Sequence, residues 1–157
     1  MIKEQQNMMA LYIGFLISTI LSFLPSYNLQ ILGFIFFFAT LIMTYIYKYR
    51  SDINSFQYSH SKYLIKTVWI FSIFLLIGII IAGTLADNSS INATMNNIMN
   101  GQMISEAELE NILMGYMKQN AFLFFITIVP SFLYFLYRIF KGIKLIKNNS
   151  AVTNPKT

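Results

Sequence analysis

Four long runs of apolar residues, separated by mostly short polar stretches, dominate the pattern of the chain. They cover residues 8–24, 29–47, 63–86 and 121–140. About 20 apolar residues in a helix are enough to cross the ~30 Å hydrocarbon layer of a bilayer. The third run would measure roughly 36 Å at 1.5 Å per residue, so it must tilt or protrude. The pattern therefore predicts an all-α integral membrane four-helix bundle.

The connection 87–120 is the long polar segment between the third and fourth runs. Ser105 and Glu108 have the spacing of a capping box, in which each side chain bonds the backbone N–H of the other residue. The apolar residues that follow recur at helical spacing, which predicts a short amphipathic helix: Leu109, Ile112, Leu113 and Tyr116. A weaker stripe predicts another turn or two before Gly101: Ile91, Met95, Ile98 and Met99. Because the polar face is acidic, we expect docking on the protein's own helices or at the membrane interface.

Small residues four positions apart predict where helices approach each other closely. Gly14, Ser18 and Ser22 form such a stripe in the first run, and Gly78 and Ala82 repeat the spacing in the third. Lipid offers no hydrophobic drive between helices, so close backbone contact is the usual substitute. We expect both stripes to face neighbouring helices.

Pro130 lies inside the fourth run and predicts a kink, because proline cannot donate the helical hydrogen bond. A hydroxyl of Thr127 or Ser131, or another helix, could satisfy the freed carbonyl. Broken helices of this kind also occur in transporters, so transport is one reading of the feature.

Composition supports lipid as the main solvent of this chain. Its 157 residues are 56% hydrophobic and 11% charged, against about 25% charged residues in soluble domains. We expect residues 1–147 to form a single four-span domain and residues 148–157 to be a disordered cytoplasmic tail. The chain has no cysteine, which excludes disulfides and thiolate chemistry.

The basic residues predict the topology. The net charge is +5, but the cations flank the apolar runs and form no dense basic patch, so we expect no nucleic-acid partner. An N-terminus inside leaves Lys118 alone outside and puts ten cations inside: Lys3, Lys48, Arg50, Lys62, Lys66, Arg138, Lys141, Lys144, Lys147 and Lys156. With many Ile, Phe, Asn and Lys residues, typical of AT-rich bacteria, this predicts a bacterial inner membrane and two cytoplasmic termini.

The stretch 58–69 contains the single histidine and the single tryptophan of the chain. On a helix, one face would carry His60, Tyr63 and Thr67, and another face Lys62, Lys66 and Trp69. Anchoring or packing is the first interpretation, because Tyr, Trp and Lys favour the membrane interface. Contact with a lipid headgroup or a partner is the second, and Arg138 and Lys141 extend that candidate surface. Catalysis is the third, although His60 lacks a partner carboxylate; the pattern implies no metal or cofactor.

Two motifs resemble those of a known family. Ser59-His60, Tyr63, Ile65-Lys66-Thr67 and Trp69 resemble its Ser-His-x-x-aromatic-x-Ile-basic-Thr-aromatic-Trp signature. Tyr137-Arg138-Ile139-Phe140-Lys141-Gly142 is similar to the close of its last span, Tyr-Arg-Ile-x-basic-Gly. The family comprises small bacterial four-span inner-membrane proteins of unassigned activity, remotely similar to the Tic-type chloroplast translocon channel component. The resemblance extends to about Lys147 and implies four spans; Val68 stands where the family usually has an aromatic.

These observations favour a non-enzymatic membrane component that acts through partner membrane proteins, a second copy of itself, or the lipid bilayer. A small transporter or channel is the alternative, suggested by Pro130 and the polar face of the third run. The spans contain no Asp or Glu, which disfavours ion-coupled transport. An interface enzyme that uses His60 is the second alternative.

Overall fold

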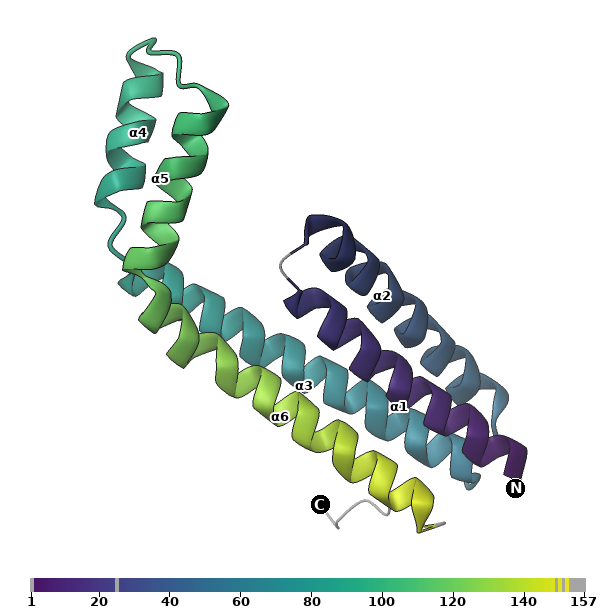
Figure 1. The fold of residues 1–157 in the computed structure, drawn as a ribbon. Coiled ribbons are helices and arrows are strands. Elements are labelled where there is room, and N and C mark those ends of the chain that lie inside the picture. Colours follow the sequence, from purple (N-terminus) through teal and green to yellow (C-terminus); the bar gives the residue numbers. More distant parts are fainter. Residues whose placement is uncertain (1, 25, 149, 151, 153–157) are drawn as a thin grey trace. The chain divides into compact units, whose positions relative to one another are not determined.

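The computed structural model describes residues 2–24, 26–148, 150 and 152. Regular structure in these residues is helical throughout: α1 (Ile2–Phe23), α2 (Tyr27–Arg50), α3 (Phe56–Leu85), α4 (Ser89–Met99), α5 (Glu106–Gln119) and α6 (Ala121–Lys147). Four of these helices, α1, α2, α3 and α6, are long and apolar enough to cross a membrane, and α4 and α5 occupy the long connection (Figure 1). The predicted all-α, four-span bundle is confirmed.

The membrane helices are longer than the apolar runs that predicted them. α1 begins at Ile2 rather than at residue 8, α3 begins at Phe56 rather than at residue 63, and α6 continues to Lys147. The reason is that Lys, Glu and Gln are good helix formers, so backbone hydrogen bonding continues into polar turns. An apolar run marks the part suited to lipid rather than the ends of the helix. Consequently the whole stretch 58–69 lies within α3.

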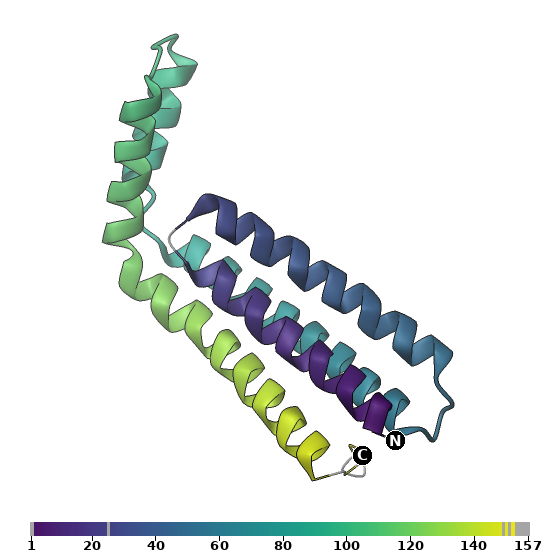
Figure 2. The ribbon, with the colours of Figure 1, turned by 45° about the vertical axis from the view of Figure 1, so that its right-hand side comes forward.

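The chain forms two compact units. Unit 1 comprises the residues up to Ser72 and those from Leu133 onward, and unit 2 comprises Ile73–Phe132. In unit 1, α1 and α2 are antiparallel, and α1 also lies beside the unit 1 parts of α3 and α6 (Figures 1 and 2). The start of α1, the end of α2, the start of α3 and the end of α6 meet at one end of this unit. Most of the cations of the chain therefore belong to helix ends that lie at the same end of unit 1.

Small residues bring α1 and α2 into close contact. A Cβ added to Gly14 would lie 2.9 Å from Thr40 Oγ1, and one added to Gly33 would lie 2.9 Å from both Ser18 O and Ser22 Oγ. Ser18 itself is fully buried. The small-residue stripe predicted in the first run is therefore confirmed as a helix contact, with Gly33 as its counterpart on α2.

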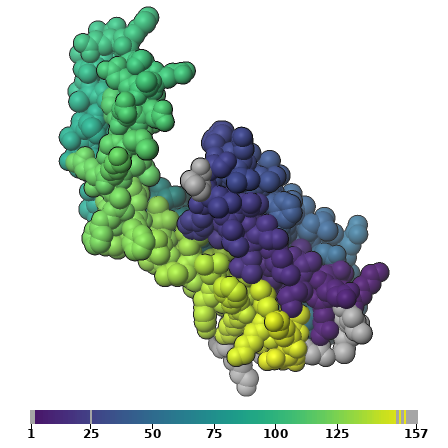
Figure 3. Space-filling view, viewed as in Figure 1, coloured from purple at the N-terminus to yellow at the C-terminus, as the bar shows by residue number. Residues whose placement is uncertain are grey.

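The core of unit 1 is aromatic, whereas its outer surface is apolar. Phe135 of α6 lies between Phe15 of α1 and Phe71 of α3, at ring-centroid distances of 6.0 and 4.7 Å. On α2, large apolar side chains point outward instead, and Phe34 is 63% exposed. Exposed apolar surface on this scale is suited to lipid rather than water. Figure 3 shows the end of α6 packed directly against α1 on one face of the unit.

Unit 2 contains the helical connection and the helix ends on which it is built. Ser105 caps α5 by accepting a hydrogen bond from Glu108 N (3.3 Å), which confirms the predicted start of this helix. The stripe before Gly101 forms a full helix of 11 residues, longer than the predicted turn or two. The expected docking of α5 is partial, because Ile112 and Tyr116 are half-buried while Leu109 and Leu113 stay 43% and 46% exposed.

α6 passes through Pro130 without a break in its helical assignment. Proline leaves the carbonyl of Ile126 without its usual donor. Thr127 was a predicted substitute donor, but its hydroxyl donates to Leu123 O (2.8 Å) and Phe124 O (3.3 Å). Thr127 is therefore not the donor, because a threonine hydroxyl in a helix reaches the carbonyls three and four residues before it, not the preceding one. The other two alternatives, Ser131 and another helix, stay predictions.

The predicted tail, residues 148–157, is covered in part. Residues 149, 151 and 153–157 lie outside the described residues. Disorder of this tail and the single-domain organisation of residues 1–147 both stay predictions.

Candidate functional site

The two predicted faces of α3 separate as the helical spacing indicated. His60 and Thr67 are fully buried and Tyr63 is nearly so, whereas Lys62 and Lys66 are exposed and Trp69 is 60% exposed. The first set therefore packs inside unit 1, and the second set faces outward. These two sets can serve different roles.

His60 is held between two partners from distant parts of the chain. Its Nε2 lies 3.2 Å from the carbonyl oxygen of Ser150, and its Nδ1 lies 3.1 Å from the hydroxyl oxygen of Tyr12. A carbonyl oxygen can only accept, so Nε2 is the donor. In the neutral ring Nδ1 is then the acceptor, and the Tyr12 hydroxyl donates to it. Both ring nitrogens are thus engaged, which leaves His60 no free lone pair for general-base chemistry.

The other two inward residues of α3, Tyr63 and Thr67, both contact Arg138 of α6, which completes the inward cluster. Its Nε donates to Thr67 Oγ1 (3.3 Å), and its guanidinium carbon lies 3.9 Å from the centroid of the Tyr63 ring. The Tyr63 hydroxyl donates to the backbone carbonyl of Arg138 (3.1 Å), and Thr67 Oγ1 donates to Tyr63 O (2.8 Å). The cation is therefore stabilised by a ring face and a hydroxyl rather than by a carboxylate. These bonds join α3 to α6.

The outward face of α3 carries one residue that is hydrogen-bonded to α2, Trp69, and two exposed cations, Lys62 and Lys66. Trp69 Nε1 donates to the Tyr45 hydroxyl of α2 (2.9 Å), which fixes the indole in one position. The bond joins α3 to α2 near the middle of α3, and it gives the indole N–H a partner. Lys62 and Lys66 lie one turn apart on the exposed surface. Their ammonium groups are positioned for contact with an anion or a partner.

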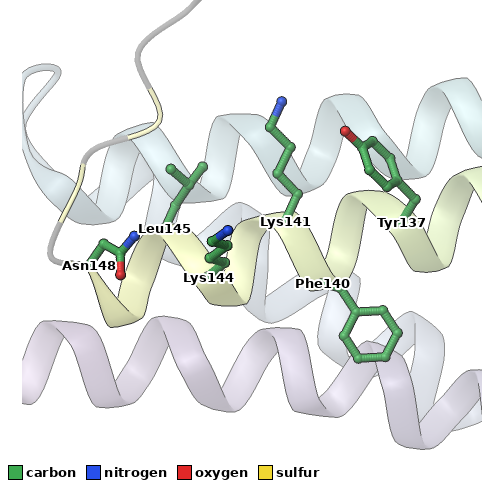
Figure 4. Close-up of a pocket in the computed structure, with 6 residues that line it drawn as sticks. All are labelled: Tyr137, Phe140, Lys141, Lys144, Leu145 and Asn148. Atoms are coloured by element: carbon green, nitrogen blue, oxygen red, sulfur yellow. The ribbon is translucent and has the colours of Figure 1, made fainter.

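Lys141 lies in a different place, on the exposed face of α6. It lines an open groove of about 440 Å³ together with Tyr137, Phe140, Lys144, Leu145 and Asn148 (Figure 4). All six residues belong to the end of α6 or directly follow it. The candidate residues thus fall into three groups: an inward cluster, the outward face of α3, and the groove on α6.

Several residues of the site were not predicted from the sequence. Tyr12 is the main one; a tyrosine inside an apolar run needs a hydrogen-bond partner when buried, and that was the available signal. Gly142 permits this arrangement, because a Cβ at this position would overlap the Tyr12 ring. The Ser150 carbonyl had no sequence signal, since any residue there supplies the same acceptor.

The inward residues are hydrogen-bonded within the protein. Within the described residues, no three His, Asp or Glu side chains come together as a metal-binding group. The polar atoms of His60, Tyr63 and Thr67 each have a partner inside the protein. The arrangement can therefore stabilise the association of α1, α3 and α6, and the outward cations are the groups left available for binding.

The two motifs that resemble the translocon-related family meet in unit 1, because Tyr63 and Thr67 of the first contact Arg138 of the second. Comparison with protein-family models, curated proteins and solved structures found no match. The resemblance therefore stays a prediction from these two motifs.

Proposed function

We propose that this protein is a non-enzymatic, multi-pass component of a bacterial cytoplasmic membrane. It acts by binding a second membrane component through the outward cations at one end of unit 1. The observation that carries the proposal is the division of the site into two sets. Inside the protein, His60 bonds to Tyr12 and Ser150, and Tyr63, Thr67 and Arg138 bond to one another, whereas Lys62, Lys66 and Lys141 are exposed.

The proposed orientation has both termini in the cytoplasm. Nine cations belong to the described helix ends that meet in unit 1, against two acidic residues in that unit, Glu4 and Asp52. Cytoplasmic membrane faces attract basic residues, and anionic lipid is concentrated there. The acidic connection that contains α4 and α5 would then face outward.

Two other functions receive less support from the geometry. An enzyme that uses His60 would need a free ring nitrogen, but Tyr12 and Ser150 occupy both. A transporter would need polar groups open to its cargo, whereas Thr67 and Tyr63 are buried and bonded within the protein. Pro130 still favours transport as the runner-up, because proline in a membrane helix weakens the backbone ladder there.

The family suggested by the two motifs is part of the proposal. Membership would group this chain with small four-span membrane proteins remotely similar to a translocon channel component. Partner proteins would then be the first class to search for, with lipid and a second copy of the chain as the other two classes.

Site-specific photocrosslinking in native membranes tests the proposal. A photoreactive phenylalanine at position 66, where the side chain is exposed, should crosslink to a partner protein, a second copy or a lipid. The same residue at position 65, where the native isoleucine is 8% exposed, is the matched control and should crosslink within the chain. If positions 62, 66 and 141 all yield only uncrosslinked protein, the proposal is wrong.

A further inference from the structure

The groove at the end of α6 is built from one regular stripe of side chains. Tyr137, Lys141, Lys144 and Asn148 follow at spacings of four, three and four residues, which places them on one face of a helix. All four are exposed. The opposite face carries residues that are buried in unit 1: Phe135, Ile139, Gly142 and Ile146. The end of α6 thus packs into unit 1 through its buried face, and its opposite face is exposed.

Each residue of this stripe can donate a hydrogen bond. The Tyr137 hydroxyl, the two lysine ammonium groups and the Asn148 amide are all donors, and the ammonium groups carry charge. Phe140 and Leu145 line the same groove with apolar surface (Figure 4). Donors and cations beside apolar surface match an anionic amphiphile, with an anionic head and a hydrocarbon chain.

The charge of the groove is not neutralised by the acidic residues of unit 1. Glu4 lies in α1 and Asp52 lies between α2 and α3, and neither lines the groove. Adjacent cations at positions 138 and 147 add to the positive potential. The groove also lies where α6 changes from an apolar to a cationic helix, the level at which lipid phosphates are found.

We infer that this groove is a binding site for the phosphate of an anionic phospholipid. Lys141 and Lys144, one turn apart, bind the phosphate, while Phe140 and Leu145 contact the first part of an acyl chain. The open groove of about 440 Å³ has room for a headgroup and leaves most of the acyl chains in the bilayer. The inference rests on the proposed function, because it identifies one component that the cationic end binds.

Native mass spectrometry of the full-length protein in detergent provides the test. Phosphatidylglycerol should be retained more strongly than phosphatidylcholine with the same acyl chains. The double variant Lys141→Gln, Lys144→Gln should weaken phosphatidylglycerol binding by about tenfold to thirtyfold, since each surface lysine contributes to anionic-lipid binding. Glutamine keeps the helix propensity and removes the charge.

A matched control separates a specific site from general charge. The variant Lys3→Gln, Arg50→Gln removes the same charge from exposed positions of α1 and α2 and should leave phosphatidylglycerol binding within about twofold of that of the native protein. Equal losses in both double variants would overturn the inference, and so would equal retention of the two lipids. Glycerol phosphate, which has no acyl chain, should fail to compete; effective competition would identify a soluble phosphate as the ligand instead.

The outcome is distinguishable from that of the proposed function. Crosslinking of a partner protein at position 66 together with unaltered lipid binding in Lys141→Gln, Lys144→Gln would reject this site alone. Specific lipid binding without any crosslinked partner protein or second copy would support the groove and restrict the proposed function to lipid contact.

Discussion

At the scale of single residues, Ser150 and Tyr12 together engage both ring nitrogens of His60. The Ser150 carbonyl requires a proton on Nε2, and the Tyr12 hydroxyl supplies the hydrogen bond to Nδ1. Phe56 also lies against the imidazole, at a ring-centroid distance of 4.3 Å and an interplanar angle of 45°. A histidine enclosed in this way contributes to packing between α1 and α3. Ligand contact and catalysis, the second and third interpretations of this stretch from the sequence, would each need an exposed atom, whereas the His60 side chain is fully buried.

Tyr12→Phe should destabilise the folded protein by about 1–3 kcal/mol, because the buried Nδ1 of His60 loses its donor. Thermal unfolding in detergent measures the change. Tyr49→Phe removes a hydroxyl from a side chain that is 81% exposed and serves as the control, with a change within about 0.5 kcal/mol. Equal stability of the two variants would show that the Tyr12–His60 bond contributes little.

Asp87 fixes the junction between α3 and α4 in unit 2. The backbone N–H and the hydroxyl of Ser89, and then the amide of Gln119, hold the pKa of the Asp87 carboxyl below its usual range. A carboxyl with a lowered pKa stabilises the folded state above its unfolded pKa of about 3.9. That contribution is lost as the pH falls through the lower, folded value.

The pKa of Asp87 should therefore be lower in the folded protein than in a peptide of residues 84–92. Carbon-13 NMR titration of the labelled carboxyl in both samples measures the difference. The Gln119→Ala variant should move the folded value part of the way back up, since one of the donors is removed. Identical titration of peptide and protein would contradict the geometry of this junction.

At the scale of elements, small residues of α3 mark where this helix contacts α6. Gly78 lies against the backbone of α6, because a Cβ at that position would overlap the carbonyl oxygen of Thr127. Ala82, four residues later, is fully buried. Gly83 is adjacent in sequence but has no atom within 4 Å of an added Cβ. The Gly78 and Ala82 stripe is therefore a confirmed helix contact, and Gly83 lies outside it.

These two glycines give a matched pair of variants. Gly78→Ala should destabilise the protein by about 1–3 kcal/mol, because the backbone of α6 must move to admit the methyl group. Gly83→Ala should stabilise it by about 0.5–1 kcal/mol, since alanine is the better helix former. Chemical or thermal unfolding in the same detergent compares them. If Gly78→Ala is the more stable variant, α3 and α6 do not pack at Gly78 as described.

At the scale of the whole molecule, most of the basic residues lie toward one set of helix ends. α1 and α2 are antiparallel, and the helix ends that carry most of the basic residues meet in unit 1. Lys118, the cation assigned to the other side by the sequence, lies near the end of α5 in unit 2. Charge bias between the two sides of a membrane sets orientation, so this distribution leads to a direct experiment.

Because the chain has no cysteine, single-cysteine variants can report topology without background labelling. Met103→Cys, at a fully exposed position in the α4–α5 connection, should react with an impermeant maleimide in intact bacterial cells with a permeabilised outer membrane. Asp52→Cys, in the exposed α2–α3 connection, should react only after the inner membrane is opened. The reverse result would overturn the cytoplasmic placement of the termini.

Local pattern was sufficient to predict a large part of this protein. Four apolar runs predicted four candidate membrane helices, because a helix that crosses lipid must satisfy its backbone internally and present apolar side chains. Helical spacing also predicted the two separate faces of residues 58–69 in α3, since residues three and four apart share a face. Ser105 indicated the start of α5 through its cap. These features depend on residues close together in the chain.

Tertiary structure alone decided what the buried residues do. Tyr12, His60 and Ser150 are far apart in the sequence, and so are Tyr63 and Arg138, so no local spacing could pair them. The groove on α6 likewise depends on which face of that helix packs inward. By itself the sequence determined the helices and the two faces of α3, and the structure decided which of these faces is buried. The fold decided that His60 is enclosed and that the exposed cations are the groups available for binding, because long-range packing selects each side chain's partners.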